Sequence, residues 1–219
     1  MSTTATTERT RQHYERDATK YDGRIKFFER LLFGGGREWV CRQAEGEVLE
    51  IALGTGRNLP FYPDGVRLTG IELSPAMLEI AARRAADVGR EADLQVGDAQ
   101  SLGFPAARFD TVVCTLSLCT IPDDRAAVAE AKRVLRPGGR FLLLEHVRSA
   151  VLPIRAGQRM LEPLFVRFQC DHLLREPLEH LEAEGFEIER LERSKLGIVE
   201  RVAARKPGGR GPDPRRTAA

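Results

Sequence analysis

The stretch from Val48 to Asn58, VLEIALGTGRN, constrains the fold of this chain more than any other. Four residues that favour β structure, Val48 to Ile51, run directly into a turn that contains Gly54 and Gly56. Asn58 and Pro60 follow, and a helix could begin there. A strand that ends in a glycine turn ahead of a helix brings backbone amides close to a ligand. This is how an open α/β sheet holds a nucleotide-like cofactor.

The glycine spacing excludes two classes of nucleotide site. A dinucleotide site needs G-x-G-x-x-G, whereas this chain has Ala52-x-Gly54-x-Gly56 and lacks the third glycine. The chain also lacks the G-x-x-x-x-G-K-[ST] motif of P-loop proteins. Glu50, at the end of the strand, is out of place beside a pyrophosphate. It suits a ligand with a cationic amine, or it orients the amides of the loop.

Three later segments add to this interpretation. Arg67 to Glu72 is predicted to be a second strand that ends in an acid, where a carboxylate binds the two hydroxyls of a ribose. Gln95 to Ala99 is predicted to end a third strand at Asp98, which could accept a hydrogen bond from an adenine amino group. Leu135 to Phe141, LRPGGRF, is predicted to be a helix end and a turn before another strand.

As a set, these segments make the chain similar to the class I S-adenosylmethionine-dependent methyltransferases over about residues 45–147. The resemblance implies a Rossmann-like, doubly wound α/β sheet of seven strands. The sheet is expected to be mostly parallel with an antiparallel C-terminal strand, and N-terminal lid helices are expected to accompany it. The expected domains are 1–44 for the lid helices, 45–206 for the methyltransferase domain with a helical insertion at 147–184, and 207–219 for a disordered tail.

The resemblance also implies S-adenosylmethionine as the cofactor and assigns roles to matching positions. Glu50, Gly54 and Gly56 would lie at its methionine end and Glu72 at its ribose hydroxyls. Asp98 and the Ala99 amide would lie at its adenine. The full set of predicted cofactor residues is Tyr21, Glu50, Ala52, Gly54, Gly56, Asn58, Glu72, Leu73, Asp98, Ala99 and Thr115. Ala52 stands where the family usually has glycine, and we expect only a slight adjustment there.

The N-terminal segment carries a second motif. Residues 1–7 are rich in threonine and are expected to be disordered, and a charged helix is predicted from Glu8. Tyr14 to Asp22 matches a Y-x-x-x-A-x-x-Y-D lead-in found in the branch that methylates quinone precursors, phospholipids and other small molecules. In that branch the segment implies a lid over cofactor and acceptor, with Tyr21 near the methionine moiety. Alternatively, it is a surface helix whose tyrosines pack on the domain.

Periodicity places the remaining elements. A helix is predicted from Pro75 to Val88 with Ser74 as its N-cap. Further predicted elements are strands at 92–96, 109–115 and 140–145, a helix from Asp123 towards Pro137, and an antiparallel pair at 187–194 and 198–204. Two amphipathic stretches, 25–33 and 151–168, could pack on the sheet, line an acceptor pocket or contact a membrane.

Candidate catalytic groups are few. Leu116 to Ile121 follows the fourth strand, and ligands in open α/β sheets bind beyond the carboxyl ends of strands, so the methyl group should meet its acceptor there. His146 could act as a base or could bond a loop carbonyl in a purely structural role. A sulfonium has a neutral leaving group, so alignment of nucleophile and methyl in a dry pocket supplies much of the rate.

Composition argues against nucleic-acid binding, a membrane span and a metal site. A net charge of +2 is too small to indicate nucleic-acid binding, and no apolar run approaches the ~20 residues of a membrane span. The four cysteines have no metal-site spacing, including those around Cys170-Asp171-His172, so no metal is expected. The N-terminus lacks the apolar region of a signal peptide. These features predict a cytoplasmic protein, and peripheral contact with a membrane and the oligomeric state stay open.

The leading hypothesis is transfer of a methyl group to a small-molecule acceptor by in-line displacement. The insertion and the Glu145-His146 pair look most like a branch that includes thiol and lipid-associated methyltransferases. The alternatives within the enzyme class are a phospholipid N-methyltransferase at a membrane surface and a quinone-precursor C-methyltransferase. A nicotinamide oxidoreductase and a non-catalytic cofactor-binding protein are disfavoured.

Overall fold

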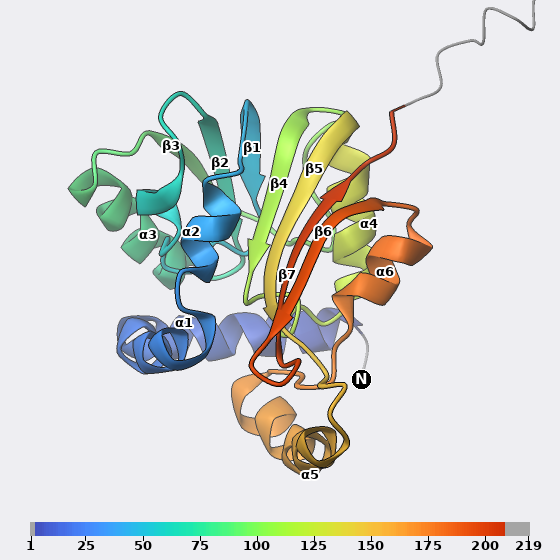
Figure 1. Ribbon diagram of the computed structural model, residues 1–219. Helices are drawn as coiled ribbons and strands as arrows, with labels where there is room; N and C mark the ends of the chain where they lie inside the picture. Colours follow the sequence, from blue (N-terminus) through green and yellow to red (C-terminus); the bar gives the residue numbers. More distant parts are fainter. Residues whose placement is uncertain (1–2, 209–219) are drawn as a thin grey trace, which may run out of the picture.

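A single seven-stranded sheet forms the centre of the molecule (Figure 1). The computed structural model describes residues 3–208. The strand order is β3-β2-β1-β4-β5-β7-β6, and β1 to β5 are parallel to one another, whereas β7 is antiparallel to both β5 and β6. The strands are β1 (Glu47–Glu50), β2 (Arg67–Glu72), β3 (Ala92–Val96), β4 (Phe109–Thr115), β5 (Leu135–His146), β6 (Glu187–Ser194) and β7 (Val199–Arg205). The predicted doubly wound, mostly parallel fold is confirmed.

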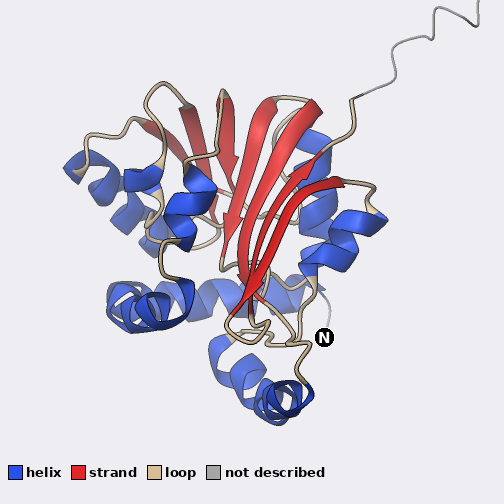
Figure 2. Ribbon diagram, in the orientation of Figure 1, coloured by secondary structure: helices blue, strands red, loops and turns tan. Residues whose placement is uncertain are grey.

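Helices cover both faces of this sheet (Figure 2). Two of them, α2 (Gly36–Cys41) and α3 (Pro75–Asp87), pack on one face, and α4 (Asp124–Val134) and α6 (Pro177–Ala183) pack on the other. The long helix α1 (Thr3–Phe28) runs across the carboxyl ends of the parallel strands and continues into a π-helical turn, η1 (Glu29–Phe33). Helix α5 (Leu152–Gln169) lies beyond α1 at the same end of the molecule.

The core consists of two apolar layers that follow the alternation of side chains along each strand. In β1, Val48 faces the layer beneath α2 and α3, and Leu49 faces the layer beneath α4 and α6. In β4, Val113 faces the layer beneath α2 and α3, and Val112 faces the layer beneath α4 and α6. Because both faces are covered, the central strands are continuously apolar rather than alternating with polar residues.

The structure differs from the sequence-based predictions at three places. The helix expected near Asn58 is only a 3₁₀ turn, η2 (Leu59–Phe61), because Pro63 follows closely and the residue before it, Tyr62, is extended. Helix α1 already begins at Thr3, so residues 3–7 are helical where disorder was expected. Strand β5 begins at Leu135, ahead of a register shift, where a turn was expected. Most of the predicted tail, residues 209–219, lies outside the described residues.

Two amphipathic segments leave apolar side chains in solvent. Phe27 and Phe28 at the end of α1 are 67% and 53% exposed, and Leu31 of η1 is 57% exposed. Helix α5 exposes a further set, namely Leu152, Met160, Leu161, Leu164 and Phe168. These side chains therefore do not pack on the sheet. None of the helices within residues 3–208 combines the length and apolar character needed to cross a bilayer.

Candidate active site

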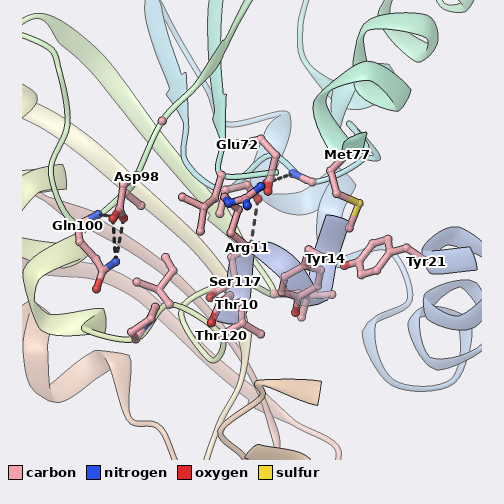
Figure 3. A pocket seen from close by; sticks show the side chains of 18 residues that line it. Thr10, Arg11, Tyr14, Tyr21, Glu72, Met77, Asp98, Gln100, Ser117 and Thr120 are labelled. Atoms are coloured by element: carbon pink, nitrogen blue, oxygen red, sulfur yellow. Dashed lines mark hydrogen bonds between the residues drawn. The ribbon is translucent and has the colours of Figure 1, made fainter. Parts of the chain in front are cut away.

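A cavity lies at the carboxyl edge of the sheet, between α1 and the loops that follow β1 to β4 (Figure 3). Asp98 and Gln100 lie at one end of it, and Tyr21 lies at the other. Open α/β sheets bind ligands at this position, where the chain reverses the strand order between β1 and β4. Of the predicted cofactor residues, seven line the cavity: Tyr21, Ala52, Gly54, Glu72, Leu73, Asp98 and Ala99.

Glu72 connects the two loops that form one wall of the cavity. Its Oε2 accepts a hydrogen bond from the Gly54 amide at 2.8 Å, and its Oε1 accepts one from the Ser74 amide at 3.0 Å. Burial raises the pKa of this carboxyl, and the amides of Ser74 and Gly54 oppose that shift. Since a carboxylate offers about four acceptor positions, Glu72 retains acceptor capacity for a ligand after holding the glycine turn in place.

Asp98 is bonded to a neighbour that the sequence did not indicate. The Gln100 amide nitrogen and its side chain Nε2 each donate to Asp98 Oδ1 at 2.9 Å. The same Nε2 donates to Thr7 of α1 at 3.1 Å, and Oε1 of Gln100 accepts from the Asp123 amide at 2.9 Å. Gln100 therefore links the predicted adenine-binding acid to α1 and to the start of α4.

The other four predicted cofactor residues, Glu50, Gly56, Asn58 and Thr115, do not line the cavity. Asn58 Nδ2 donates to Glu50 Oε1 at 2.7 Å and to Thr115 Oγ1 at 2.9 Å. Tyr62 donates to Glu50 Oε2 at 2.8 Å, and burial raises the pKa of Glu50 to about 7. These side chains form a polar network beneath the glycine turn.

Gly56 serves packing in this structure. It has a φ of +75°, and a Cβ there would lie 2.6 Å from Leu59 Cδ1 and 3.1 Å from Ala81 Cβ of α3. Gly54 differs, because it has a φ of +61° and a Cβ there would meet nothing within 4 Å. The open space at Gly54 belongs to the cavity, whereas Gly56 allows α3 to approach the turn.

Two residues that are not glycine adopt left-handed backbone conformations at the cavity. Ala52 follows β1 with a φ of 50°, and Leu116 follows β4 with a φ of 54°. This conformation costs an L-residue roughly 1–2 kcal/mol, a cost that glycine would not carry at either position. Ala52 lines the cavity despite this conformation.

Helix α1 is held over the cavity mainly by polar contacts. Ser74 Oγ donates to Glu15 at 2.6 Å, Thr55 Oγ1 donates to Asp22 at 2.7 Å, and Arg84 forms an ion pair with Asp22. Among the described residues of α1, Ala18 is the one apolar residue that is buried. A segment held by hydrogen bonds and ion pairs opens more readily than one held by a buried apolar face.

His146 is not among the residues that line this cavity. Its Nε2 is 3.0 Å from Asp171 Oδ1, and Asp171 also accepts a hydrogen bond from the Cys119 thiol. Burial opposes a charge on His146, but Asp171 raises its pKa above the usual value. The structure thus brings Cys119, His146 and Asp171 together, although their spacing along the chain indicated neither a metal site nor a triad.

Several residues of the cavity were missed from the sequence. Thr10, Arg11 and Tyr14 of α1 line it, as do Met77 and Gln100. Tyr14 occupies the first tyrosine of the N-terminal motif, so that motif was a usable signal for it. The other four carry no motif, and only the fold places them beside the glycine turn.

Comparison with known proteins agrees with this architecture. A family model described as a methyltransferase domain matches residues 49–143. The thiol S-methyltransferase TMT1A of Homo sapiens is 31% identical over 76% of this chain and 70% of its own length. The phosphatidylethanolamine N-methyltransferase of Cereibacter sphaeroides is 36% identical over 53% of this chain, and the match spans 58% of that protein. The demethylmenaquinone methyltransferase of Thermus thermophilus is 34% identical over 58% of this chain and 61% of its own length.

The fold has close counterparts among solved structures. A methyltransferase of Thermotoga maritima, titled a possible histamine N-methyltransferase, superposes with a TM-score of 0.70 at 21% identity, over 90% of this chain and 99% of that one. At that identity the likeness concerns the fold alone. Sequence match, strand order and the cavity at the carboxyl edge agree, and the chain belongs to the class I S-adenosylmethionine-dependent methyltransferases.

Proposed function

We propose that the cavity binds S-adenosylmethionine and that the protein transfers its methyl group to a small-molecule acceptor enclosed by α1. The observation that carries the proposal is the position of Glu72, a buried carboxylate at the end of β2 that is fixed by the Gly54 and Ser74 amides and faces the cavity. It would bind the ribose hydroxyls of the cofactor.

The rest of the cavity is suited to the same cofactor. The open space beside Gly54 would admit the methionine portion close to the backbone of the turn. At the opposite end, Asp98 and the Ala99 amide would bind adenine, with Gln100 giving up its side-chain contact to Asp98. Tyr21, at the end of the cavity away from Asp98, would lie near the methionine moiety.

When bound, S-adenosylmethionine supplies an electrophilic methyl group on a sulfonium whose departure leaves a neutral thioether. The chain has to hold an acceptor atom in line with that methyl group and exclude water. Leu116, Ser117, Thr120 and Ile121 line the cavity beyond β4, and Tyr14 of α1 completes this part of the wall. We assign these residues to the acceptor. The proposed reaction assigns no proton transfer to His146, which lies outside the lining.

Calorimetric titration with S-adenosylmethionine tests the cofactor assignment. Glu72→Gln should weaken binding by more than about tenfold, because charge-assisted hydrogen bonds contribute roughly 1.5–3 kcal/mol. Glu79→Gln is the matched control, since Glu79 lies on the exposed side of α3 and only pairs with Arg83. Equal affinity of the Glu72→Gln variant and the control would refute the ribose assignment.

Methyl-labelled S-adenosylmethionine, purified protein and a cell extract test the transfer itself. Label in low-molecular-weight aqueous products would favour a polar metabolite or thiol as the acceptor, and label in an organic phase would favour a lipid or quinone. The named relatives act on a thiol, on phosphatidylethanolamine and on demethylmenaquinone. Cofactor binding without transfer into either phase would contradict the proposed methyltransferase activity.

A phospholipid acceptor is the second candidate, favoured by one observation. Phe27, Phe28 and Leu31 form an exposed apolar set at the end of α1, which covers the cavity. Exposed apolar groups on a lid next to cationic side chains such as Lys26 and Arg30 suit a bilayer surface. Flotation with vesicles that contain phosphatidylethanolamine and an anionic lipid tests this candidate, and protein that stays in the soluble fraction would contradict it.

A further inference from the structure

Cys119, His146 and Asp171 form a side-chain cluster that the proposed methyl transfer does not use. Their ligand atoms, the Cys119 Sγ, the His146 imidazole nitrogen and an Asp171 carboxylate oxygen, all lie within 4.8 Å of one another. They come from three segments of the chain: the loop after β4, the end of β5, and the loop between α5 and α6. Within residues 3–208 this is the set with the donor atoms of a metal site.

The arrangement differs from that of a nucleophilic triad. In a triad the histidine lies between the nucleophile and the acid, so that it can take the proton of the nucleophile. Here Asp171 contacts both other members, because it is 3.0 Å from His146 Nε2 and accepts a hydrogen bond from Cys119. Three donor atoms within 4.8 Å of one another, which do not form a relay, are close enough to share one cation.

We propose that Cys119, His146 and Asp171 bind a borderline divalent transition-metal ion, for which Zn²⁺ is the representative. One thiolate, one neutral imidazole and one carboxylate match the ligand types of Zn²⁺. The thiolate and the carboxylate together balance the charge of a divalent ion. Ca²⁺ and Mg²⁺ are excluded as the preferred ions, because both require oxygen ligands.

The surroundings hold each ligand in place. The Ser117 and Leu118 amides donate to Glu145 Oε1 at 2.8 and 2.9 Å, which fixes the loop that carries Cys119. The Leu173 amide donates to Glu162 of α5 at 2.6 Å, which fixes the loop that carries Asp171. His146 is fixed by its place in β5, paired with Val199 of β7. Such outer contacts orient metal ligands and strengthen binding.

The geometry of the cluster gives a metal ion access from solvent and leaves one coordination position open. Cys119 is buried, whereas the side chains of His146 and Asp171 are 14% and 22% exposed, so an ion can enter from their side. Three protein ligands leave one position of a tetrahedral ion free for water or another ligand. Tyr14, which lines the cavity, shares a hydrogen bond with Thr120, the neighbour of Cys119. The cluster therefore adjoins the acceptor side of the cavity.

Titration with Co²⁺ after removal of metals by a chelator tests the proposal without any use of S-adenosylmethionine, so its outcome is separate from that of the proposed function. We expect one Co²⁺ per chain and a near-ultraviolet charge-transfer band from the Cys119 thiolate. Cys119→Ser should abolish the band, and His146→Ala or Asp171→Asn should weaken Co²⁺ and Zn²⁺ binding by at least about tenfold. Circular dichroism confirms that each variant is folded.

Cys170→Ser is the matched control, because Cys170 is a partly exposed thiol adjacent to Asp171 that is not in the cluster. This variant should keep both the band and the stoichiometry. The proposal is overturned if folded wild-type protein binds no Co²⁺, if the band survives in Cys119→Ser, or if the band disappears in Cys170→Ser.

Discussion

Replacement of Glu50 by glutamine should stabilise this protein, and the gain should depend on pH. Glu50 is 1% exposed, and its carboxyl oxygens accept hydrogen bonds from Asn58 and Tyr62, both of which are neutral. Glutamine has the shape of a protonated glutamate and cannot ionise. In the variant the amide oxygen can accept from Asn58 and the amide nitrogen can donate to the Tyr62 hydroxyl, so both positions stay bonded while the cost of a buried charge is removed.

The magnitude follows from the pKa. Burial raises the pKa of Glu50 from 4.5 to about 7. Each pKa unit is worth about 1.4 kcal/mol, so this difference corresponds to about 3 kcal/mol. The folded state holds the proton more tightly than the unfolded chain does. The stabilisation that comes from protonation of Glu50 is therefore complete below the unfolded pKa and is lost as the pH rises through the folded pKa. The glutamine variant does not lose this stabilisation, because its side chain does not ionise.

Urea unfolding of wild type and Glu50→Gln at about pH 4.5 and about pH 8 measures the effect, with the free energy of unfolding extrapolated to water. We expect similar stabilities at the lower pH and an advantage of about 3 kcal/mol for the variant at the higher pH. Glu47→Gln, at the half-buried beginning of the same strand, where the carboxylate pairs with Arg67, is the control and should show no comparable gain. An equal difference between variant and wild type at both pH values would show that the reasoning from burial is wrong.

Three further predictions concern the cavity and its cover. Gly54→Ala and Gly65→Ala both place a Cβ in open space at a positive φ, so each should destabilise the protein by roughly 1–2 kcal/mol in thermal unfolding; only Gly54→Ala, whose Cβ enters the cavity, should also weaken S-adenosylmethionine binding in calorimetry. Asp22→Asn removes the ion pair with Arg84 and should speed hydrogen exchange in α1 while exchange in the sheet stays unchanged; equal rates in α1 would count against the polar attachment. Phe27→Ser combined with Phe28→Ser should change the free energy of unfolding by less than about 0.5 kcal/mol because both rings are exposed, and it should lower recovery with lipid vesicles if the acceptor is a phospholipid.

Much of the fold was predictable because local signals and burial coincide in its centre. Strand β2 has the predicted bounds, Arg67–Glu72, since an apolar run is closed by a charged residue at each end. Helix α3 starts where Ser74 and Pro75 predict, and Ser74 caps it by accepting from the Met77 amide. These features depend on residues adjacent in the chain, and this explains why the sequence was sufficient for them.

The site was less predictable, because its contacts join residues that are far apart in sequence. Motif matching gave Glu50 a role at the methionine end of the cofactor, and it could not show that the side chain is bonded to Asn58 and Tyr62 beneath the glycine turn. Gln100 has no motif, and its contacts with Asp98 and α1 arise only after folding. A search for short spacings between metal ligands likewise could not find the cluster of Cys119, His146 and Asp171, because these residues are far apart in the chain.

Because polar contacts hold α1 over the cavity, we expect the covering of the cavity by α1 to depend on salt concentration. The Arg84–Asp22 and Arg57–Glu29 pairs are partly exposed to solvent, and dissolved salt screens such charges over a Debye length of about 8–10 Å at 0.1–0.15 M. The sheet beneath, with its apolar layers, has no comparable sensitivity to screening. Salt concentration should therefore shift the balance between covered and uncovered cavity while leaving the folded domain intact, so cofactor exchange and global stability would respond differently to the same change of buffer.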